Sequence, residues 1–213
     1  MLTSPAFAIR LAVPADIPAL HLLIEQSIRG LQTRDYTPAQ IEGALGHALG
    51  LDTQLIQDQT YFIANLQSAN SLSQVANTKV ADTKVANTIV ADTITGAPEK
   101  LAGCGGWSFR QTLFGSDHGP GRIGAVMDPQ NDAAKIRAIF VHPEFARRGL
   151  GTLILAHCEQ AAQQAGFRRF EMGSTLTGLP LYTQRGYREI ERTDVPLPNG
   201  EFLPIVRMAK SVR

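Results

Sequence analysis

A short basic segment with two glycines, residues 146–151 (ARRGLG), is the feature of this sequence that most constrains its fold. It follows an apolar, strand-like run at 135–141 and leads into a helix-like run that begins at Gly149. A strand that turns into a helix in this way exposes the first backbone N–H groups of the helix at the positive end of its dipole. Such groups bind anions, and glycine lets a phosphate approach the backbone closely. Because Arg147 and Arg148 add positive charge, the segment predicts a diphosphate site.

The spacing of the glycines excludes two common nucleotide-binding loops. A dinucleotide-binding fingerprint requires G-x-G-x-x-G, and the place of the third glycine is taken by Ile154. A nucleoside triphosphate loop requires G-x-x-x-x-G-K-[ST], and the sequence contains no such run. The diphosphate must therefore belong to another kind of ligand.

With those loops excluded, residues 139–152 resemble the cofactor loop of the GNAT superfamily of acyl-CoA N-acyltransferases. Residues 181–187 (LYTQRGY) are similar to the Y-x-x-x-G-F/Y signature of the same family, and the two motifs occur in the family's order. One position departs from the pattern, because the family's [RQ]-x-x-G-x-[GA] loop begins with Arg or Gln and this chain has Ala146. Most of such a cradle is backbone, so we expect weaker cofactor binding rather than its loss.

The resemblance implies that acetyl-CoA is the co-substrate and that an acetyl group passes directly to a primary amine of a small molecule or peptide. In the family, the strand before the loop splays from its neighbour, and the pantetheine arm pairs with the exposed strand backbone. Carried over to this chain, the implied cofactor-binding residues are Ile139, Phe140, Val141, Arg147, Arg148, Gly149, Leu150, Gly151 and Thr152.

Two residues are candidates for catalysis. Tyr182 takes the place of the signature tyrosine, and a phenol with a pKa near 10 can protonate a departing thiolate whose thiol has a pKa of about 8.5. The alternative for Tyr182 is that it only packs under the cofactor. Glu171 lies where some members of the family carry a glutamate, and it is the candidate general base. A strand glutamate is often a solvated surface residue, so a water chain that leads to bulk solvent is the alternative base.

The pattern of apolar residues predicts an α/β (α+β) chain in which strands and helices follow one another in the order typical of the GNAT family. The resemblance therefore implies the GNAT fold, a mixed and mostly antiparallel central sheet of about seven strands flanked by helices. The predicted strands lie at 7–11, 60–64, 100–109, 135–141, 169–172, 187–195 and 202–208, and the predicted helices lie at 14–28, 37–49, 149–165 and 179–185.

Length and composition restrict the class of protein. A chain of 213 residues that is 44% hydrophobic fits one domain, and the resemblance implies a single N-acetyltransferase domain over 1–213. A net charge of +1 gives no reason to expect a nucleic-acid or membrane partner. Cys104 and Cys158 make no disulfide framework, and no histidine or cysteine has ligand spacing, so we expect a cytoplasmic protein without a metal. A homodimer is one expected assembly.

Residues 67–98 form an unusual connection between two predicted strands. Val75, Val80, Val85 and Val90 recur every five residues, and the stretch contains no aromatic residue. A period of five keeps these valines on no single face of a helix or a strand. We expect a low-complexity, pentad-repeat insertion without a chemical role, and a partner-binding or packed element is the alternative.

The acceptor and the functional class are less constrained by the sequence. Tyr36, Trp107, Phe109 and Phe114 either line an acceptor pocket or pack in the core. Candidate acceptors are a free amino acid, a polyamine, an amine-bearing antibiotic and a peptide N-terminus. The alternative function is a catalytically idle acyl-CoA-binding sensor or interaction module of the same fold, and the presence of Tyr182 favours the enzyme.

Overall fold

A seven-stranded sheet in the order β1-β2-β3-β4-β5-β7-β6 forms the centre of the protein. The computed structural model describes residues 6–67, 100–119 and 123–212. Neighbouring strands are antiparallel, except that β4 and β5 run parallel. The predicted mixed, mostly antiparallel sheet is therefore confirmed. The strands are β1 (Phe7–Leu11), β2 (Tyr61–Leu66), β3 (Leu101–Ser108), β4 (Ala134–Val141), β5 (Arg169–Thr175), β6 (Arg188–Pro196) and β7 (Phe202–Ser211).

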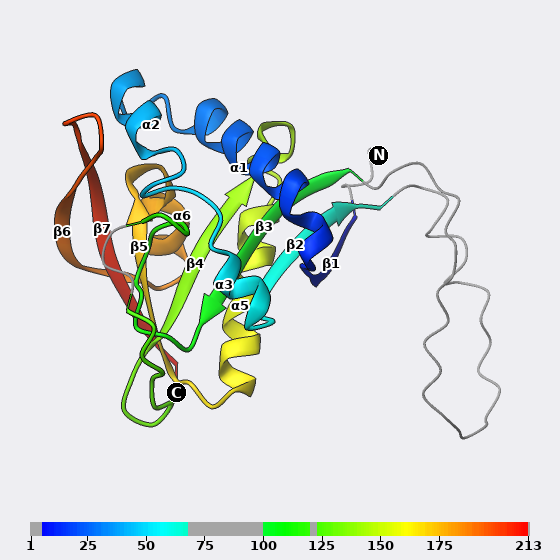
Figure 1. The fold of residues 1–213 in the computed structure, drawn as a ribbon. Helices are drawn as coiled ribbons and strands as arrows, with labels where there is room; N and C mark the ends of the chain where they lie inside the picture. The colour runs from blue at the N-terminus through cyan, green and yellow to red at the C-terminus, as the bar shows by residue number, and fades with distance from the viewer. Residues whose placement is uncertain (1–5, 68–99, 120–122, 213) are drawn as a thin grey trace.

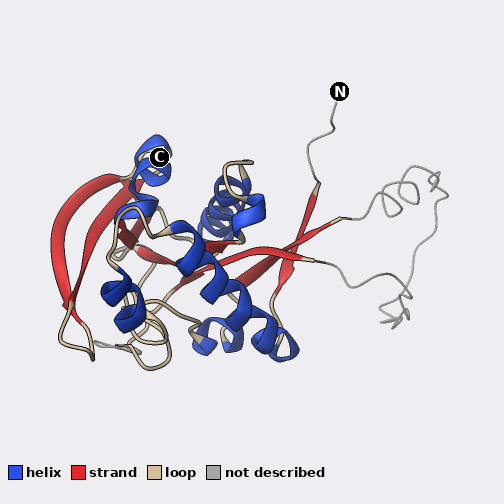
Figure 2. Cartoon of the chain, turned by 90° about the horizontal axis from the view of Figure 1, so that it is seen from above, coloured by secondary structure: helices blue, strands red, loops and turns tan. Residues whose placement is uncertain are grey.

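Helices cover both faces of this sheet, as Figures 1 and 2 show. The first three helices lie on one face, and α5 and α6 lie on the other (Figure 1). Three short 3-10 turns lie in the described part of the chain. One precedes α1, one precedes the loop that leads into α5, and one precedes α6. The helices are α1 (Ile17–Leu31), α2 (Pro38–Ala44), α3 (Thr53–Gln57), α5 (Leu150–Gln164) and α6 (Leu179–Gln184), and the turns are η1 (Pro14–Asp16), η2 (Pro143–Phe145) and η3 (Leu176–Gly178).

The sheet separates two hydrophobic clusters, and each belongs to one helical layer. On α1, the buried side chains Leu20, Leu23, Ile24 and Ile28 recur at helical spacing, which gives the helix one apolar stripe against the sheet. On the other face, α5 packs against β3. A Cβ at Gly105 would stand 2.6 Å from Ile154 Cγ2, so this glycine is what allows the helix to approach the strand so closely.

The second helix is shorter than the sequence predicts. Thr37 caps α2, since its hydroxyl accepts a hydrogen bond from the Gln40 N–H and its own N–H donates to the Gln40 Oε1. The predicted helix over 37–49 nevertheless ends at Ala44. Gly46 has a φ of +72°, a left-handed conformation that a continuing helix cannot use. The chain then forms α3, which the sequence does not predict.

The ends of the long β2–β3 connection lie side by side. The Leu66 N–H donates to the Lys100 carbonyl at 2.9 Å, so the two strands meet in hairpin register where the connection leaves the sheet. The predicted pentad-repeat insertion at 67–98 lies outside the described residues, apart from Gln67. The described part of the chain contains no helix that is both long and apolar enough to cross a membrane.

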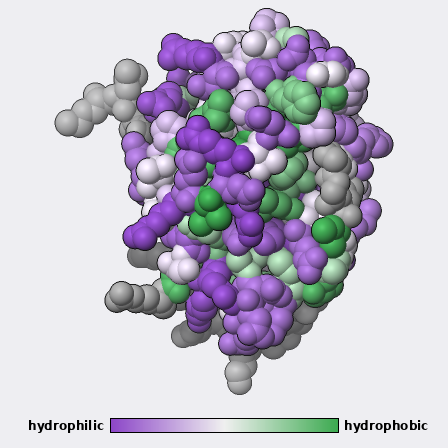
Figure 3. Space-filling model, turned by 90° about the vertical axis from the view of Figure 1, so that its left-hand side faces the viewer, coloured by the Kyte–Doolittle hydropathy of each residue, from purple (hydrophilic) through white to green (hydrophobic). Residues whose placement is uncertain are grey.

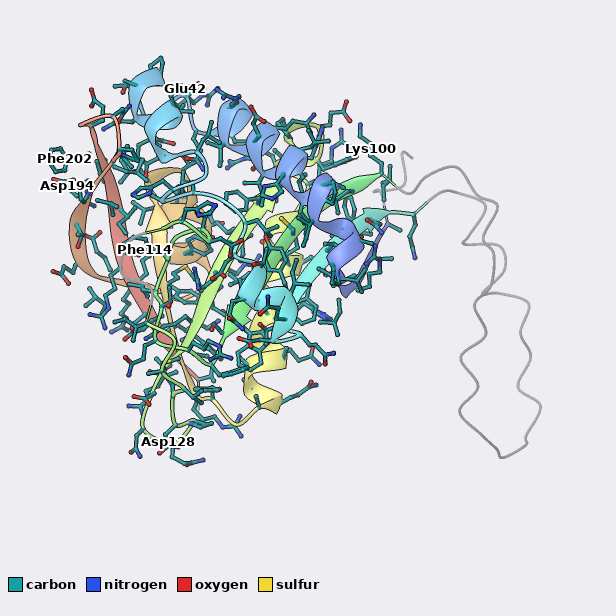
Figure 4. All side chains as sticks on the ribbon, in the orientation of Figure 1. Glu42, Lys100, Phe114, Asp128, Asp194 and Phe202 are labelled. Atoms are coloured by element: carbon teal, nitrogen blue, oxygen red, sulfur yellow. The ribbon has the colours of Figure 1, made fainter. Side chains whose placement is uncertain are left out.

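The hairpin of β6 and β7 forms one outer edge of the protein. Along β6 only Val195 is buried. Figure 3, which views the molecule from the side of this hairpin, shows hydrophobic groups scattered among hydrophilic ones. Phe202, labelled at the left of Figure 4, is a hydrophobic residue of this hairpin that is 55% exposed. Single exposed apolar side chains are common on protein surfaces and need no partner to explain them.

Candidate active site

The centre of the sheet opens because β4 and β5 separate. Their parallel pairing is confined to two positions at the start of the strands, Ala134 with Phe170 and Lys135 with Glu171. Beyond these pairs β4 carries a bulge against β3, at which Ala138 has a φ of +51°. The Tyr61 hydroxyl donates to the Ala138 carbonyl at 2.9 Å and holds the bulge in place. The gap predicted between the motif strand and its neighbour is therefore present in the structure.

A cavity of about 80 Å³ occupies this gap. Its wall comes from both helical layers, since Gln32 follows α1 and Tyr182 lies on α6. Among the described residues that line it, Arg137 and Tyr182 are the only ionisable side chains. The other lining residues are Ala48, Leu49, Gly50, Leu113, Phe114, Gly115, Ile136, Ala138, Ile139, Phe140, Met172, Gly173 and Thr175.

The backbone of β4 presents a donor to the gap. The His142 N–H donates to the Ala102 carbonyl of β3 at 2.8 Å. Because successive N–H groups of a strand point to opposite edges, those of Ile139 and Val141 point away from β3. The Val141 N–H donates to the Ser27 hydroxyl of α1 at 3.2 Å, which leaves the Ile139 N–H directed at the gap.

The three strand residues predicted to bind the cofactor consequently differ in position. Ile139 and Phe140 line the cavity, whereas Val141 is not among the described residues of its wall and its N–H is engaged by Ser27. Nothing in the sequence pattern of α1 distinguishes Ser27 from an ordinary helix residue. Its role depends on where α1 crosses β4, which only the structure gives.

The loop before α5 has the shape that an anion site requires. Gly149 is the N-cap of α5 with a φ of +80°, and Arg147 has a φ of +62°. A Cβ at Gly149 would meet no atom within 4 Å, so the space in front of this residue is open. Both Arg147 and Arg148 are exposed. The first N–H groups of the helix have no intrahelical acceptor and face outward at its positive end, which fits a diphosphate.

Two other residues of the predicted loop have structural contacts. Leu150 is 1% exposed and packs in the core on the α5 face, so only its backbone can serve a ligand. The Thr152 hydroxyl lies 3.3 Å from the Arg185 guanidinium, which donates to it. At Gly151 a Cβ would stand 3.2 Å from Leu181, so this glycine also sets how closely α6 approaches α5.

Tyr182 projects from α6 into the cavity wall. It is 9% exposed, and its ring packs edge-on against Tyr187 at 6.1 Å between centroids. A Cβ at Gly178 would stand 2.6 Å from Tyr182 Cε2, so the preceding glycine makes room for the ring. The Tyr182 hydroxyl has no hydrogen-bond partner among the described residues. Burial raises the pKa of this phenol, which keeps it in the neutral, proton-donating form.

Glu171, the predicted base, lies at the closed end of the gap. It pairs with Lys135 on β4 at 2.8 Å and with Arg207 on β7 at 3.0 Å. Burial raises the pKa of its carboxyl, but these two cations outweigh burial and the net shift is downward. It is not among the described residues of the cavity wall. A carboxylate held ionised between two cations at this place bridges three strands, and the position disfavours the role of general base.

The four aromatic residues considered for an acceptor pocket lie in three different places. Phe114 lines the cavity and packs against β5, where a Cβ at Gly173 would stand 3.0 Å from its ring (Figure 4). Trp107 packs with Phe109 and Phe167 in the cluster on the α5 face. Tyr36 is buried on the α1 face, where its hydroxyl donates to the Pro204 carbonyl at 2.7 Å. Of the four, only Phe114 reaches the site.

A buried ion pair stiffens the wall beside Phe114. Arg137 and Asp52 have side chains that are 3% and 1% exposed, and the guanidinium donates to the carboxylate at 2.6 Å. A second N–H of Arg137 donates to the Gly115 carbonyl at 2.6 Å. The pair therefore ties β4 to the start of α3 and to the loop that carries Phe114.

A larger groove of about 420 Å³ adjoins the cavity, and the two share Leu49 and Gly50 in their walls. The groove lies between α1, the α2–α3 connection and the loop after Phe114. Arg29 pairs with both Glu25 and Glu42 at its rim. Its polar lining residues are His21, Glu25, Arg29, Glu42, Ser116, Asp117 and His118. Within the described ranges, no three His, Cys, Asp or Glu side chains are grouped as a metal site would need.

Comparison with known proteins agrees with this geometry. Residues 111–211 match the model of the acetyltransferase (GNAT) domain family. A search of curated proteins gives no match.

Among solved structures, a GCN5-related N-acetyltransferase (aminotransferase, class-II) from Rhodopseudomonas palustris is 18% identical with a TM-score of 0.62, over 100% of this chain and 98% of that one. The PaiA N-acetyltransferase from Thermoplasma acidophilum, solved in complex with coenzyme A, is 11% identical with a TM-score of 0.54, over 97% of this chain and 99% of that one. The ribosomal-protein-S18-alanine N-acetyltransferase from Escherichia coli is 14% identical with a TM-score of 0.52, over 97% and 94% of the two chains.

These identities are low, so the structural likenesses establish the fold alone. They confirm the predicted fold. The chain has the GNAT fold, including the parallel β4–β5 pair typical of it, and residues 111–211 match the acetyltransferase (GNAT) domain family.

Proposed function

We propose that this chain, whose fold is that of GNAT acetyltransferases, transfers an acetyl group from acetyl-CoA to a primary amine of a small molecule or peptide. One observation carries the proposal. A buried tyrosine whose hydroxyl has no partner among the described residues lies in the wall of a cavity between β4 and β5. The same strand, β4, leads directly into a helix start suited to a diphosphate.

The residues of the loop and strand suit the two ends of acetyl-CoA. The backbone at 147–152, together with Arg147 and Arg148, would hold the diphosphate at the start of α5. Ile139 and Phe140 would lie along the pantetheine arm in the gap. The Ile139 N–H would donate to the acetyl oxygen, which polarises the carbonyl that the amine attacks. Bound acetyl-CoA supplies the thioester.

Tyr182 completes the transfer as the proton donor. The amine nitrogen forms a bond to the acetyl carbon while the bond from that carbon to sulfur breaks. The Tyr182 hydroxyl gives its proton to the departing sulfur, so CoA leaves as the thiol. Its raised pKa keeps the proton on the phenol at physiological pH. The proton that the nitrogen loses returns, through water, to the phenolate.

The acceptor amine must reach the cavity without its extra proton. No carboxylate or histidine is found among the described residues of the cavity wall. The adjoining groove carries both kinds of group, and we place the body of the acceptor there. The ammonium then loses its proton to water or to a group of the groove before the nitrogen enters the gap. In this scheme Glu171 has no part in proton transfer, because its ion pairs hold it at the closed end of the gap.

The test is a thiol-release assay with acetyl-CoA and a panel of amines, with the acetylated product identified by mass spectrometry. The panel contains free amino acids, spermidine, kanamycin and a peptide with a free N-terminus, which represent the four acceptor classes. Release of CoA that depends on one of these amines, with matching acetylated product, supports the enzyme. Tight binding of acetyl-CoA without amine-dependent release across the panel would instead favour an idle acyl-CoA-binding module.

A further inference from the structure

Gln32 has a buried polar atom that the fold does not use. The residue ends α1, and its backbone is fully engaged, since its N–H donates to the Ile28 carbonyl and its own carbonyl accepts from Asp35 and Tyr36. Its side chain is different. The residue is 6% exposed and lines the cavity, yet its Oε1 has no hydrogen-bond partner among the described residues.

This unpaired oxygen is notable for its position. Buried side-chain oxygens in folded proteins nearly always have a hydrogen-bond partner, because leaving one unpaired lowers stability. Within the described part of the chain, two other buried side-chain atoms lack a hydrogen-bond partner, one on Tyr187 and one on Arg207. Neither of these residues lines the cavity. Gln32 therefore carries an unused acceptor on a side chain that lines the cavity where the proposed reaction occurs.

The two faces of the sheet contribute different groups to that place. Tyr182 and the loop before α5 belong to the α5 layer, which would carry acetyl-CoA. Gln32 belongs to the α1 layer, and so does the groove that adjoins the cavity through Leu49 and Gly50. An acceptor that enters from the groove would meet the α1 side of the cavity first.

We propose that Gln32 binds the acceptor amine, its Oε1 accepting a hydrogen bond from an N–H of the neutral nitrogen. This inference rests on the proposed function and names a residue that selects the substrate. A neutral primary amine has two N–H donors and one lone pair. One donor on Gln32 holds the nitrogen in the cavity and leaves the lone pair free to attack.

The carboxamide suits this task better than a carboxylate would. A carboxylate would favour the ammonium form, whose nitrogen has no lone pair. The one charged side chain among the described residues of the wall, Arg137, is a cation paired with Asp52, and it also disfavours an ammonium there. The cavity thus favours the neutral amine, the form that reacts.

Two substitutions at Gln32 test the proposal, with the most active amine of the panel as acceptor. Gln32→Met keeps length and volume but removes the oxygen. It should raise the KM for the amine roughly fivefold to tenfold, the usual effect of losing one hydrogen bond, and leave the affinity for acetyl-CoA unchanged in calorimetry. The control is Gln26→Met on the exposed face of the same helix, which should change neither quantity.

Gln32→Glu tests the preference for the neutral nitrogen. The carboxylate should raise the pKa of the bound amine, so the acidic limb of kcat/KM for the amine should move to higher pH by about one unit. If Gln32 only packs, the substitution should leave the acidic limb of kcat/KM at its original pH. The Gln32→Glu variant therefore still tests the role of Gln32 if the methionine variant does not fold.

The outcomes separate the two proposals. If the unaltered protein acetylates no amine of the panel, the proposed function fails before Gln32 is tested. If it does, and both variants keep its KM and pH profile, the role given to Gln32 is wrong and the oxygen is paired by water. A loss of acetyl-CoA affinity equal to the rise in KM would place Gln32 on the donor and would also overturn the proposal.

Discussion

Replacing Tyr182 by phenylalanine tests the proposed chemistry most directly. The substitution removes the hydroxyl and keeps the ring that packs against Tyr187 and Gly178. Because that hydroxyl has no partner among the described residues, its loss breaks no hydrogen bond of the fold. The free energy of unfolding should therefore change by less than about 1 kcal/mol.

Turnover should fall much more than stability. General acid catalysis contributes a factor of 10² or more, so Tyr182→Phe should lower kcat on the order of 10²-fold, which corresponds to about 2.7 kcal/mol of lost transition-state stabilisation. The affinity for CoA should stay the same, because the ring remains. With an acetyl donor whose thiol is more acidic, the same substitution should lower kcat by a smaller factor, since that thiolate needs less help to depart.

The sign of the pH dependence follows from the direction of the pKa shift. Burial raises the pKa of Tyr182 above its ordinary value of about 10, so the donor stays protonated at every pH below that value. Stability linked to this proton is likewise complete below about pH 10 and is lost as the pH rises through the folded pKa. Any limb of the rate profile near neutral pH must therefore come from another group, such as the acceptor amine.

The assay is thiol release at saturating acetyl-CoA, combined with calorimetry of CoA binding. A matched control is Tyr187→Phe, which makes the same chemical change on a neighbouring ring outside the cavity wall and should leave turnover within about twofold. If Tyr182→Phe instead weakens CoA binding at unchanged kcat, the residue is part of the packing around the cofactor and the assignment as proton donor is refuted.

Three further predictions follow from single features of the structure. Gly149→Val places a Cβ at a φ of +80° in the open space where a phosphate would lie, so calorimetry should show CoA affinity reduced roughly tenfold or more, and unchanged affinity would contradict the diphosphate site. Asp52→Ala removes the carboxylate from buried Arg137 and should lower the free energy of unfolding by about 3–5 kcal/mol in a urea titration, whereas a loss below about 1 kcal/mol would mean that the pair is not buried. Replacing 68–98 by a short Asn-Gly turn should leave melting temperature and CoA affinity unchanged, because Leu66 and Lys100 are already hydrogen-bonded, and an insoluble product would show that the segment is needed.

The sequence predicts the sheet and the loop well because both depend on local patterns. The strand-like run at 135–141 and the glycines at 149–151 encode a strand, a turn and a helix start within a few residues. The helix after Thr37 shows the limit of such patterns. Its N-cap is correct, but Gly46 adopts a left-handed conformation that the apolar periodicity through Leu49 does not reveal.

The role of Glu171 could not be decided from its neighbours in the sequence. Its partners, Lys135 and Arg207, lie 36 residues before and after it and meet it only because β5 stands between β4 and β7 in the sheet. Strand order decides whether a charged strand residue faces two cations or a substrate. The resemblance to the family places a glutamate near the site, and the pairing of these three strands places it at the closed end.

The cavity illustrates why the residues that select an acceptor escape sequence analysis. The proposed cofactor side is built from one continuous segment, β4, the loop and the start of α5, and a motif can therefore describe it. The proposed acceptor side combines Gln32 at the end of α1, the α2–α3 connection and Phe114 in a long loop, which are far apart in the chain. Each of these residues is unremarkable in its own sequence context. They come together only where the bulge at Ala138 separates β4 from β5 and lets the two helical layers reach the same space. If the two sides have the proposed roles, substitutions on the α1 face should change acceptor specificity while the affinity of the loop for CoA stays the same.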